Sequence, residues 1–142
     1  MQLIIPSVLG YEVVVRDAVA SLAQRYGLPP DRIEDIKTVL CEACTNAIEH
    51  GNGSDPHRRV RVCCTADEQS LVIEVCDEGG LPPTLPGKPV EWFPMPYPSR
   101  RGRGLKLIVA LSDEVSIAND PRFGTCIRLV FYRDPRSVIH TS

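Results

Sequence analysis

Apolar and polar residues alternate along this chain with two periods, near two and near 3.6 residues, which are typical of strands and helices respectively. Five short runs predict strands, over residues 2–5, 59–64, 71–76, 114–118 and 126–132. Helical spacing predicts three helices, one running to about Tyr26, one leading into Gly51 and one following Gly104. Residues 67–70 are polar and predict a hairpin turn between the second and third strands.

Capping residues suggest where the first two helices begin and end. Ser7 is the predicted N-cap of the first helix, which Gly27 and the following Pro29-Pro30 end. Asp31, with Glu34 three residues later, resembles a capping box and predicts the start of the second helix. Gly51-Asn52-Gly53 is a strong stop signal for that helix.

The order of these elements predicts an α+β fold, a two-layer sandwich with helices on one face of a mostly antiparallel sheet. The 142 residues are expected to form a single domain, 1–142. Between Leu81 and Ser99 stand seven prolines, so this stretch is excluded from helices and central strands and is predicted to be a lid or binding loop. Trp92 and Phe93 lie in it, and either pack the loop onto the domain or contact a partner.

Composition narrows the class of protein. A net charge of -2 makes no electrostatic case for nucleic-acid binding. No apolar run approaches the ~20 residues of a membrane span, and the start of the chain lacks the features of a signal peptide, so we expect a cytoplasmic protein. Cys41 and Cys44 are spaced like half a zinc site, but no second half completes it, and the six cysteines are expected to be reduced thiols.

The second helix carries the first candidate chemistry. Glu42 and Asn46 are four residues apart, hence one turn apart on one face, and His50 continues the row. A carboxamide oxygen suits Mg²⁺, and a neighbouring carboxylate can accept a proton from a nucleophile that attacks a phosphate. The alternative is an ordinary polar face beside the apolar stripe of this helix. That stripe consists of Ile33, Ile36, Leu40, Ala43 and Ala47.

Three further sequence elements could form a binding site together with this helix. Asp77 ends a buried strand just before Gly79-Gly80, where a carboxylate could accept a hydrogen bond from an exocyclic amine such as that of adenine. Gly102-Arg103-Gly104 opens a helix, a place where backbone N–H groups favour an anion. Gly124-Thr125 is the weakest element by itself. Each element also has a purely structural interpretation: a tight turn after Asp77, a hinge at Gly102–Gly104 and a hairpin at Gly124.

Together and in this order, the four elements resemble the nucleotide-binding boxes of the GHKL (Bergerat-fold) ATPase superfamily. The resemblance is greatest to the anti-sigma factor serine/threonine-protein kinases, small switch kinases whose asparagine box looks like E-A-x-x-N-A-x-x-H-G. Residues 42–51 here read E-A-C-T-N-A-I-E-H-G, and residues 102–108 read G-R-G-L-K-L-I. These two stretches are the most specific parts of a likeness that spans nearly the whole chain.

The resemblance implies ATP and Mg²⁺ as ligands of a histidine-kinase-like ATPase domain. It makes Glu42 the general base, Asn46 the metal ligand and residues 81–101 the ATP lid. The residues that it assigns to nucleotide binding are Asn46, His50, Asp77, Gly79, Gly80, Arg101, Gly102, Arg103, Gly104, Leu105 and Thr125.

The resemblance also implies a function in transcription regulation. The protein would phosphorylate an anti-anti-sigma (STAS-type) partner, sequester a sigma factor and form a homodimer, without direct contact with nucleic acid or membrane. Leu81 stands where the family's aspartate box, D-x-G-x-G, has its last glycine. This departure favours an alternative, a non-catalytic ATP-binding or nucleotide-free module that binds regulators. A detached catalytic domain acting on histidine is a third possibility.

Overall fold

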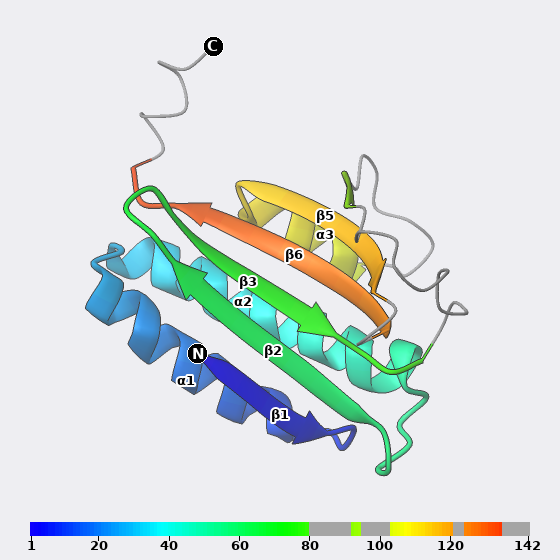
Figure 1. The fold of residues 1–142 in the computed structure, drawn as a ribbon. Coiled ribbons are helices and arrows are strands. Elements are labelled where there is room, and N and C mark those ends of the chain that lie inside the picture. Colours follow the sequence, from blue (N-terminus) through cyan, green and yellow to red (C-terminus); the bar gives the residue numbers. More distant parts are fainter. Residues whose placement is uncertain (80–91, 95–102, 121–123, 135–142) are drawn as a thin grey trace.

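The computed structural model describes residues 1–79, 92–94, 103–120 and 124–134. The chain forms two layers, a sheet and a set of helices that covers one face of it (Figure 1). The strands are β1 (Gln2–Pro6), β2 (Arg59–Ala66), β3 (Ser70–Cys76), β4 (Phe93–Pro94), β5 (Glu114–Asp120) and β6 (Gly124–Tyr132). The helices are α1 (Tyr11–Tyr26), α2 (Pro30–Asn46), a π-helical turn η1 (Ala47–Gly51) and α3 (Arg103–Leu111). The predicted α+β class is confirmed.

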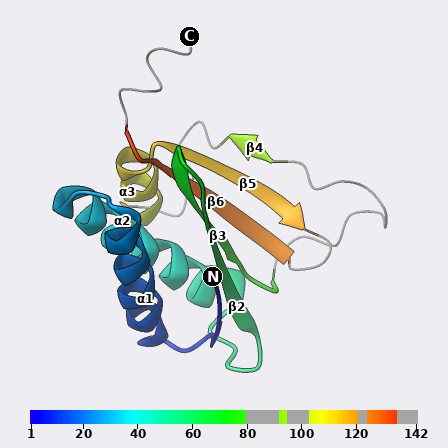
Figure 2. The same cartoon turned by 60° about the vertical axis from the view of Figure 1, so that its left-hand side comes forward.

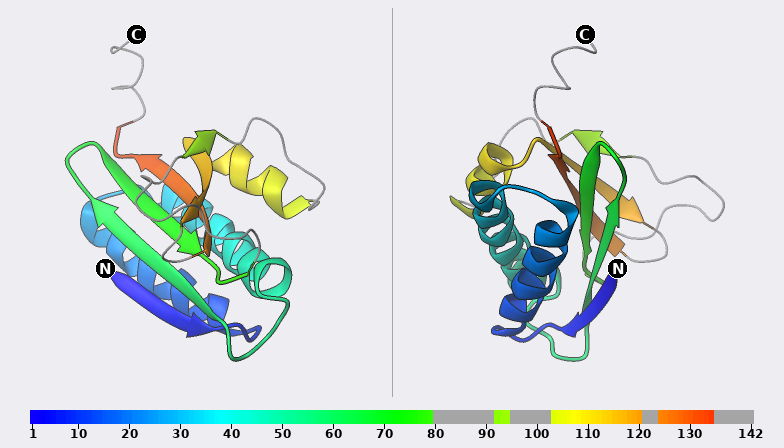
Figure 3. Two further views of the ribbon diagram at one scale, coloured as in Figure 1. Left: turned by 45° about the vertical axis from the view of Figure 1, so that its right-hand side comes forward. Right: turned by 90° about the vertical axis from the view of Figure 1, so that its left-hand side faces the viewer.

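The described strands pair in the order β1-β2-β3-β6-β5-β4, and each of these pairings is antiparallel. Side views show the described helices on the same side of this sheet (Figures 2 and 3). The central pairing, β3 with β6, joins segments that are far apart in the sequence and brings their ends together. β4 is a short edge strand on β5, a position in which proline is tolerated.

The hydrophobic core lies between the helices and the sheet. On β3, Leu71, Ile73 and Val75 point into it, in alternation with residues of the opposite face. The predicted stripe of α2 is confirmed, since Ile36, Leu40, Ala43 and Ala47 are buried and Ile33 is partly buried against the core. The largest fully buried side chains are Phe131, Ile36, Leu40, Ile48, Leu71, Ile73, Ile108 and Leu129.

Two predicted helix caps are wrong. α1 begins at Tyr11 after Gly10, and the Ser7 hydroxyl instead donates a hydrogen bond to the carbonyl of Arg58 (2.8 Å). α2 begins at Pro30, so Asp31 is already its second residue rather than its cap. Proline is favoured at the first helical position because its fixed φ suits the helix and its missing N–H is not needed there.

The predicted hairpin turn between β2 and β3 is confirmed. The Asp67 carboxylate accepts hydrogen bonds from the backbone N–H groups of Gln69 (2.8 Å) and Ser70 (2.9 Å), which lower the pKa of Asp67. The last two strands extend further than predicted, since β5 continues to Asp120 and β6 begins at Gly124.

The expectation of reduced cysteines is wrong for one pair. Cys76 and Cys126 form a disulfide, because the β3–β6 register places them directly opposite each other. Fifty residues separate them in the sequence, so no local pattern indicates the pair. The other cysteines are free thiols, namely Cys41, Cys44, Cys63 and Cys64.

Candidate functional site

The last turns of α2 hold Glu42 and Asn46, which are both half-buried and are each followed by a buried alanine, Ala43 and Ala47. The amide nitrogen of Asn46 is buried and has no hydrogen-bond partner within the described residues. A buried polar atom without a partner is costly and points to a ligand, a water or strain at that place. Asn46 therefore meets the first requirement of a ligand-binding residue.

The helix widens immediately after Asn46. The backbone N–H of Asn52 donates to the carbonyl of Ala47 (2.8 Å), a bond that spans five residues and closes the π-helical turn η1. Single π turns inside helices are frequent at functional sites. His50 lies in this turn and is exposed, so the regular helical row predicted from spacing covers Glu42 and Asn46 but does not continue unchanged to His50.

Asp77 follows β3 directly and is 6% exposed. Its backbone N–H donates to the carbonyl of Thr125 (2.9 Å), and its carboxylate accepts a hydrogen bond from the N–H of Gly79 (3.1 Å). The β3–β6 pairing thus brings together Asp77, Gly79 and Thr125, three of the residues predicted to bind a ligand.

Three glycines allow the backbone to crowd around Asp77. A Cβ on Gly79 would lie 1.7 Å from the carbonyl oxygen of Gly51, and a Cβ on Gly51 would lie 2.1 Å from a carboxylate oxygen of Asp77. A Cβ on Gly124 would lie 2.1 Å from the carbonyl oxygen of Asp77. The end of the asparagine-box helix therefore touches the Asp77 loop, so segments from two separate sequence motifs lie side by side.

Asn52 connects the same segments, and the sequence indicated it only as part of a stop signal. It is 2% exposed, its amide nitrogen donates to the Ser7 hydroxyl (2.8 Å) and the Arg59 carbonyl (3.0 Å), and its oxygen accepts from the N–H of Glu78 (2.8 Å). Both polar atoms of the Asn52 side chain are hydrogen-bonded, and these bonds fix the end of η1 against the loop after β3. An asparagine between two glycines was the available signal, but it does not specify its partners.

Replacing Asn52 by alanine is expected to destabilise the protein by about 2–3 kcal/mol, because the buried Ser7 hydroxyl and the backbone groups of Arg59 and Glu78 lose their hydrogen bonds to it. Urea denaturation measures this change. Gln69→Ala, which shortens an exposed carboxamide, is the matched control and should change stability by less than about 0.5 kcal/mol. Equal stabilities of the two variants would contradict the role assigned to Asn52.

The remaining predicted residues are described in part. α3 begins at Arg103, slightly before the start predicted after Gly104, and packs beside α2. The side chain of Leu105 is 4% exposed and belongs to the core, so only its backbone is available to a ligand. Gly80, Arg101, Gly102 and most of the predicted lid lie outside the described residues, as do the side chains at 103 and 104.

Trp92 packs onto the domain. The guanidinium of Arg128 lies over its ring, 3.9 Å from the centroid, and also pairs with Glu74 at 2.9 Å. Phe93 pairs with Ile117 in the β4–β5 ladder. Of the two interpretations of this pair of aromatic residues, packing onto the domain is confirmed for Trp92.

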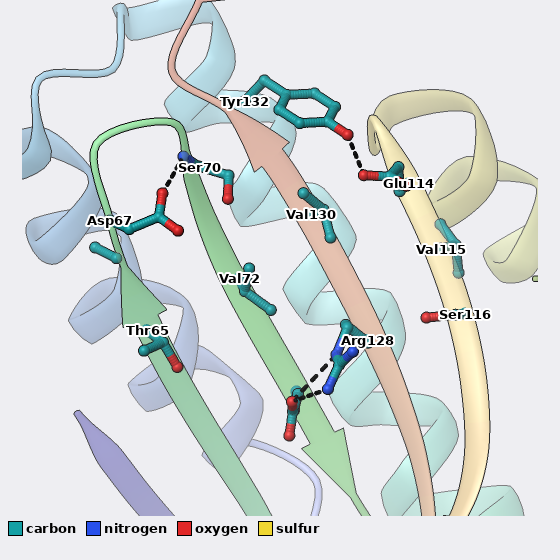
Figure 4. Close-up of a pocket in the computed structure, with 12 residues that line it drawn as sticks. Thr65, Asp67, Ser70, Val72, Glu114, Val115, Ser116, Arg128, Val130 and Tyr132 are labelled. Atoms are coloured by element: carbon teal, nitrogen blue, oxygen red, sulfur yellow. Dashed lines mark hydrogen bonds and ion pairs between the residues drawn. The ribbon is translucent and has the colours of Figure 1, made fainter. Parts of the chain in front are cut away.

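A groove of about 560 Å³ lies on the sheet face opposite the helices (Figure 4). Asp67, Glu74 and Glu114 give it an acidic character, and Glu114 accepts a hydrogen bond from the Tyr132 hydroxyl, which raises the pKa of Tyr132 to about 12. Its β3 residues alternate with those of the core, so the sheet separates the groove from Glu42 and Asn46.

Among the described residues, no helix combines the length and apolar character needed to cross a membrane. The same part of the chain holds no group of three or more His, Cys, Asp and Glu side chains that could bind a metal. A Mg²⁺ ion does not require such a group, since it usually keeps waters and takes substrate phosphates with one or two protein oxygens.

Comparison with known proteins identifies the family. The family model described as "Histidine kinase-like ATPase domain" matches residues 5–131. The anti-sigma F factor of Oceanobacillus iheyensis is 32% identical over 128 residues, which cover 89% of this chain and 88% of that protein. The serine-protein kinase RsbW of Bacillus subtilis is 30% identical over an alignment of 146 residues, which covers 96% of this chain and 87% of that protein.

The family match covers the segments that hold Glu42, Asn46, Asp77 and Thr125, and the two relatives align with most of the chain. The resemblance seen in the motifs is therefore confirmed, and the chain belongs to the histidine kinase-like ATPase domain family, alongside the anti-sigma factors and serine-protein kinases of that family.

Proposed function

We propose that this protein is an anti-sigma factor with ATP-dependent serine/threonine-protein kinase activity. It phosphorylates an anti-anti-sigma protein of the STAS type and sequesters a sigma factor. The names of its relatives support the anti-sigma role, through the anti-sigma F factor, and the kinase activity, through the serine-protein kinase. The observation that supports the proposal is the contact between the end of the Glu42–Gly51 motif and the Asp77 loop, which brings together two of the motifs assigned to nucleotide binding.

In this proposal the adenine end of ATP lies at Asp77, whose carboxylate accepts a hydrogen bond from the exocyclic amine. Gly79, Gly80 and Thr125 lie beside the base. The phosphates bind at the start of α3, where helical N–H groups attract anions. The residues assigned to that end are Gly102, Arg103, Gly104 and Leu105. His50 and Arg101 are assigned to the nucleotide without a specific end.

Asn46 suits the Mg²⁺ that accompanies ATP. Its carboxamide oxygen is a hard ligand, and its amide nitrogen is buried without a partner in the described part of the chain, so a bound group can satisfy it. When bound, the metal neutralises charge on the phosphates.

Glu42 lies one helical turn before Asn46 and is only half-buried, so it can be reached by a partner. It holds a carboxylate oxygen ready to accept the proton of the partner's serine hydroxyl. Positioning and charge neutralisation then account for most of the catalysis of phosphoryl transfer. The protein works as a homodimer in the cytoplasm, where transcription is regulated, and makes no direct contact with nucleic acid or membrane.

Asn46→Ala is expected to weaken Mg²⁺-dependent ATP binding by about 10- to 100-fold, the loss that corresponds to one hydrogen bond or ligand on a charged group. Isothermal titration calorimetry on wild type and variant, each with and without EDTA, measures it. Thr38→Ala, on an exposed face of α2, is the matched control and should bind ATP like the wild type. Equal affinity of Asn46→Ala and wild type would remove Asn46 from the site.

The second candidate is a module that binds regulators without catalysis, and Leu81 in place of the family's glycine favours it. The two candidates differ in one result. Wild-type protein that binds a sigma factor tightly but neither binds millimolar ATP nor labels a STAS-type protein would support the second candidate and exclude the first.

A further inference from the structure

The Cys76–Cys126 disulfide joins the end of β3 to the start of β6. Both residues are buried, with 4% and 1% of their surface exposed. Cys76 lies two positions after Glu74 on β3, and Cys126 lies two positions before Arg128 on β6. Residues two apart on a strand share a face, so both cysteines lie on the sheet face turned away from the helices. The bond is therefore outside the hydrophobic core that holds the domain together.

The residues next to the bond belong to the candidate site. Asp77 follows Cys76, Thr125 precedes Cys126, and the N–H of Asp77 donates to the carbonyl of Thr125 (2.9 Å). One covalent bond thus restrains the pair of strand ends proposed to hold adenine. Without this bond, these two strand ends, the Asp77–Thr125 corner, are held by backbone hydrogen bonds and by the close contact of Gly124 with the Asp77 carbonyl.

We propose that Cys76 and Cys126 form a reversible thiol–disulfide site that controls the order of the Asp77–Thr125 corner and, through it, nucleotide affinity. The nucleotide part rests on the proposed function. In the reducing step a dithiol attacks the disulfide after local opening of this corner, since both cysteines are buried in the closed fold. The Cys76–Cys126 S–S bond breaks, an S–S bond forms in the dithiol, and its two electrons and two protons end on the two cysteine thiols.

None of the four free thiols can take the place of the external dithiol. Cys41 is half-buried on α2, and burial raises its pKa. Burial raises the pKa of Cys44, and it raises the pKa of Cys64 to about 11, so both stay protonated and unreactive near neutral pH. Cys63 lies opposite Glu74 on the same sheet face as the disulfide, and burial, then the Glu74 charge, raises its pKa. Disulfides of cytoplasmic proteins are usually transient or redox-sensing, which fits a reversible bond in the proposed compartment.

Reduction of the disulfide lowers the fraction of molecules in which the Asp77–Thr125 corner is ordered. The apparent affinity for ATP falls with it, because only the ordered form is competent to bind. We expect ATP to bind about fivefold more weakly to the reduced protein. Hydrogen exchange at the Asp77 amide should become faster in parallel, with or without nucleotide.

The test compares full-length protein oxidised with glutathione disulfide and reduced with dithiothreitol, with the thiol state read by alkylation and mass spectrometry. The Cys76→Ser/Cys126→Ser double variant should behave like reduced protein in both conditions, and Cys63→Ser should respond like wild type. Failure of the disulfide to form, or equal Asp77 exchange in both states, would overturn the proposal. Faster exchange on reduction, with no ATP binding in either state, would support the redox site and refute the nucleotide function instead.

Discussion

Glu42→Gln is expected to lower the rate of phosphoryl transfer to a STAS-type partner by about 10²- to 10⁴-fold, the usual contribution of a general base. Glutamine keeps the size and polarity of the side chain but cannot take up the proton of the attacking hydroxyl. Asn46 is untouched in this variant, so ATP binding should persist. The expected result is thus a protein that binds nucleotide and partner but transfers almost no phosphate.

Transfer of label from γ-³²P-ATP to the partner, under single-turnover conditions, measures this rate. Glu49→Gln is the matched control, because Glu49 is an exposed glutamate of the adjoining turn η1 and should keep the wild-type rate. The stability of the product to acid separates serine or threonine phosphate from histidine phosphate. A Glu42→Gln variant with wild-type transfer would show that another group takes the proton.

Gly79→Ala is expected to have the largest effect on folding, a loss of about 3 kcal/mol or more of unfolding free energy. The new Cβ would lie 1.7 Å from the carbonyl oxygen of Gly51, and a backbone oxygen cannot rotate away as a side chain does. Either the loop after β3 or the end of η1 has to move. Both carry candidate site residues, so ATP binding should be lost with the stability.

Gly53→Ala separates this clash from the general cost of replacing a glycine. Gly53 has φ +61, and a Cβ there meets nothing within 4 Å, so only the left-handed backbone is penalised, by about 1 kcal/mol. Thermal and urea unfolding of both variants give the comparison. If Gly79→Ala were no less stable than Gly53→Ala, the close approach of Gly51 to the Asp77 loop would be refuted.

Local patterns were sufficient for the elements and for the main motif. Strand and helix periods, proline exclusion and the polar turn at 67–70 depend on neighbouring residues, so they can be recognised in one sequence. Glu42 and Asn46 were predictable for the same reason, since α2 is regular up to Asn46. His50 was less predictable, because the change to a π turn leaves no distinct periodicity in five residues.

The sequence by itself thus determined the fold class, the course of each main element and the family motifs. Only the tertiary structure decided how the motifs meet: the β3–β6 register that places Asp77 beside Thr125, the disulfide beside them, and the burial of Asn52 and Ser7 in one polar network. These contacts join residues far apart in the chain. Their partners are selected by the packing of the whole sheet, and one-dimensional periodicity carries no information on which distant strand ends will be adjacent.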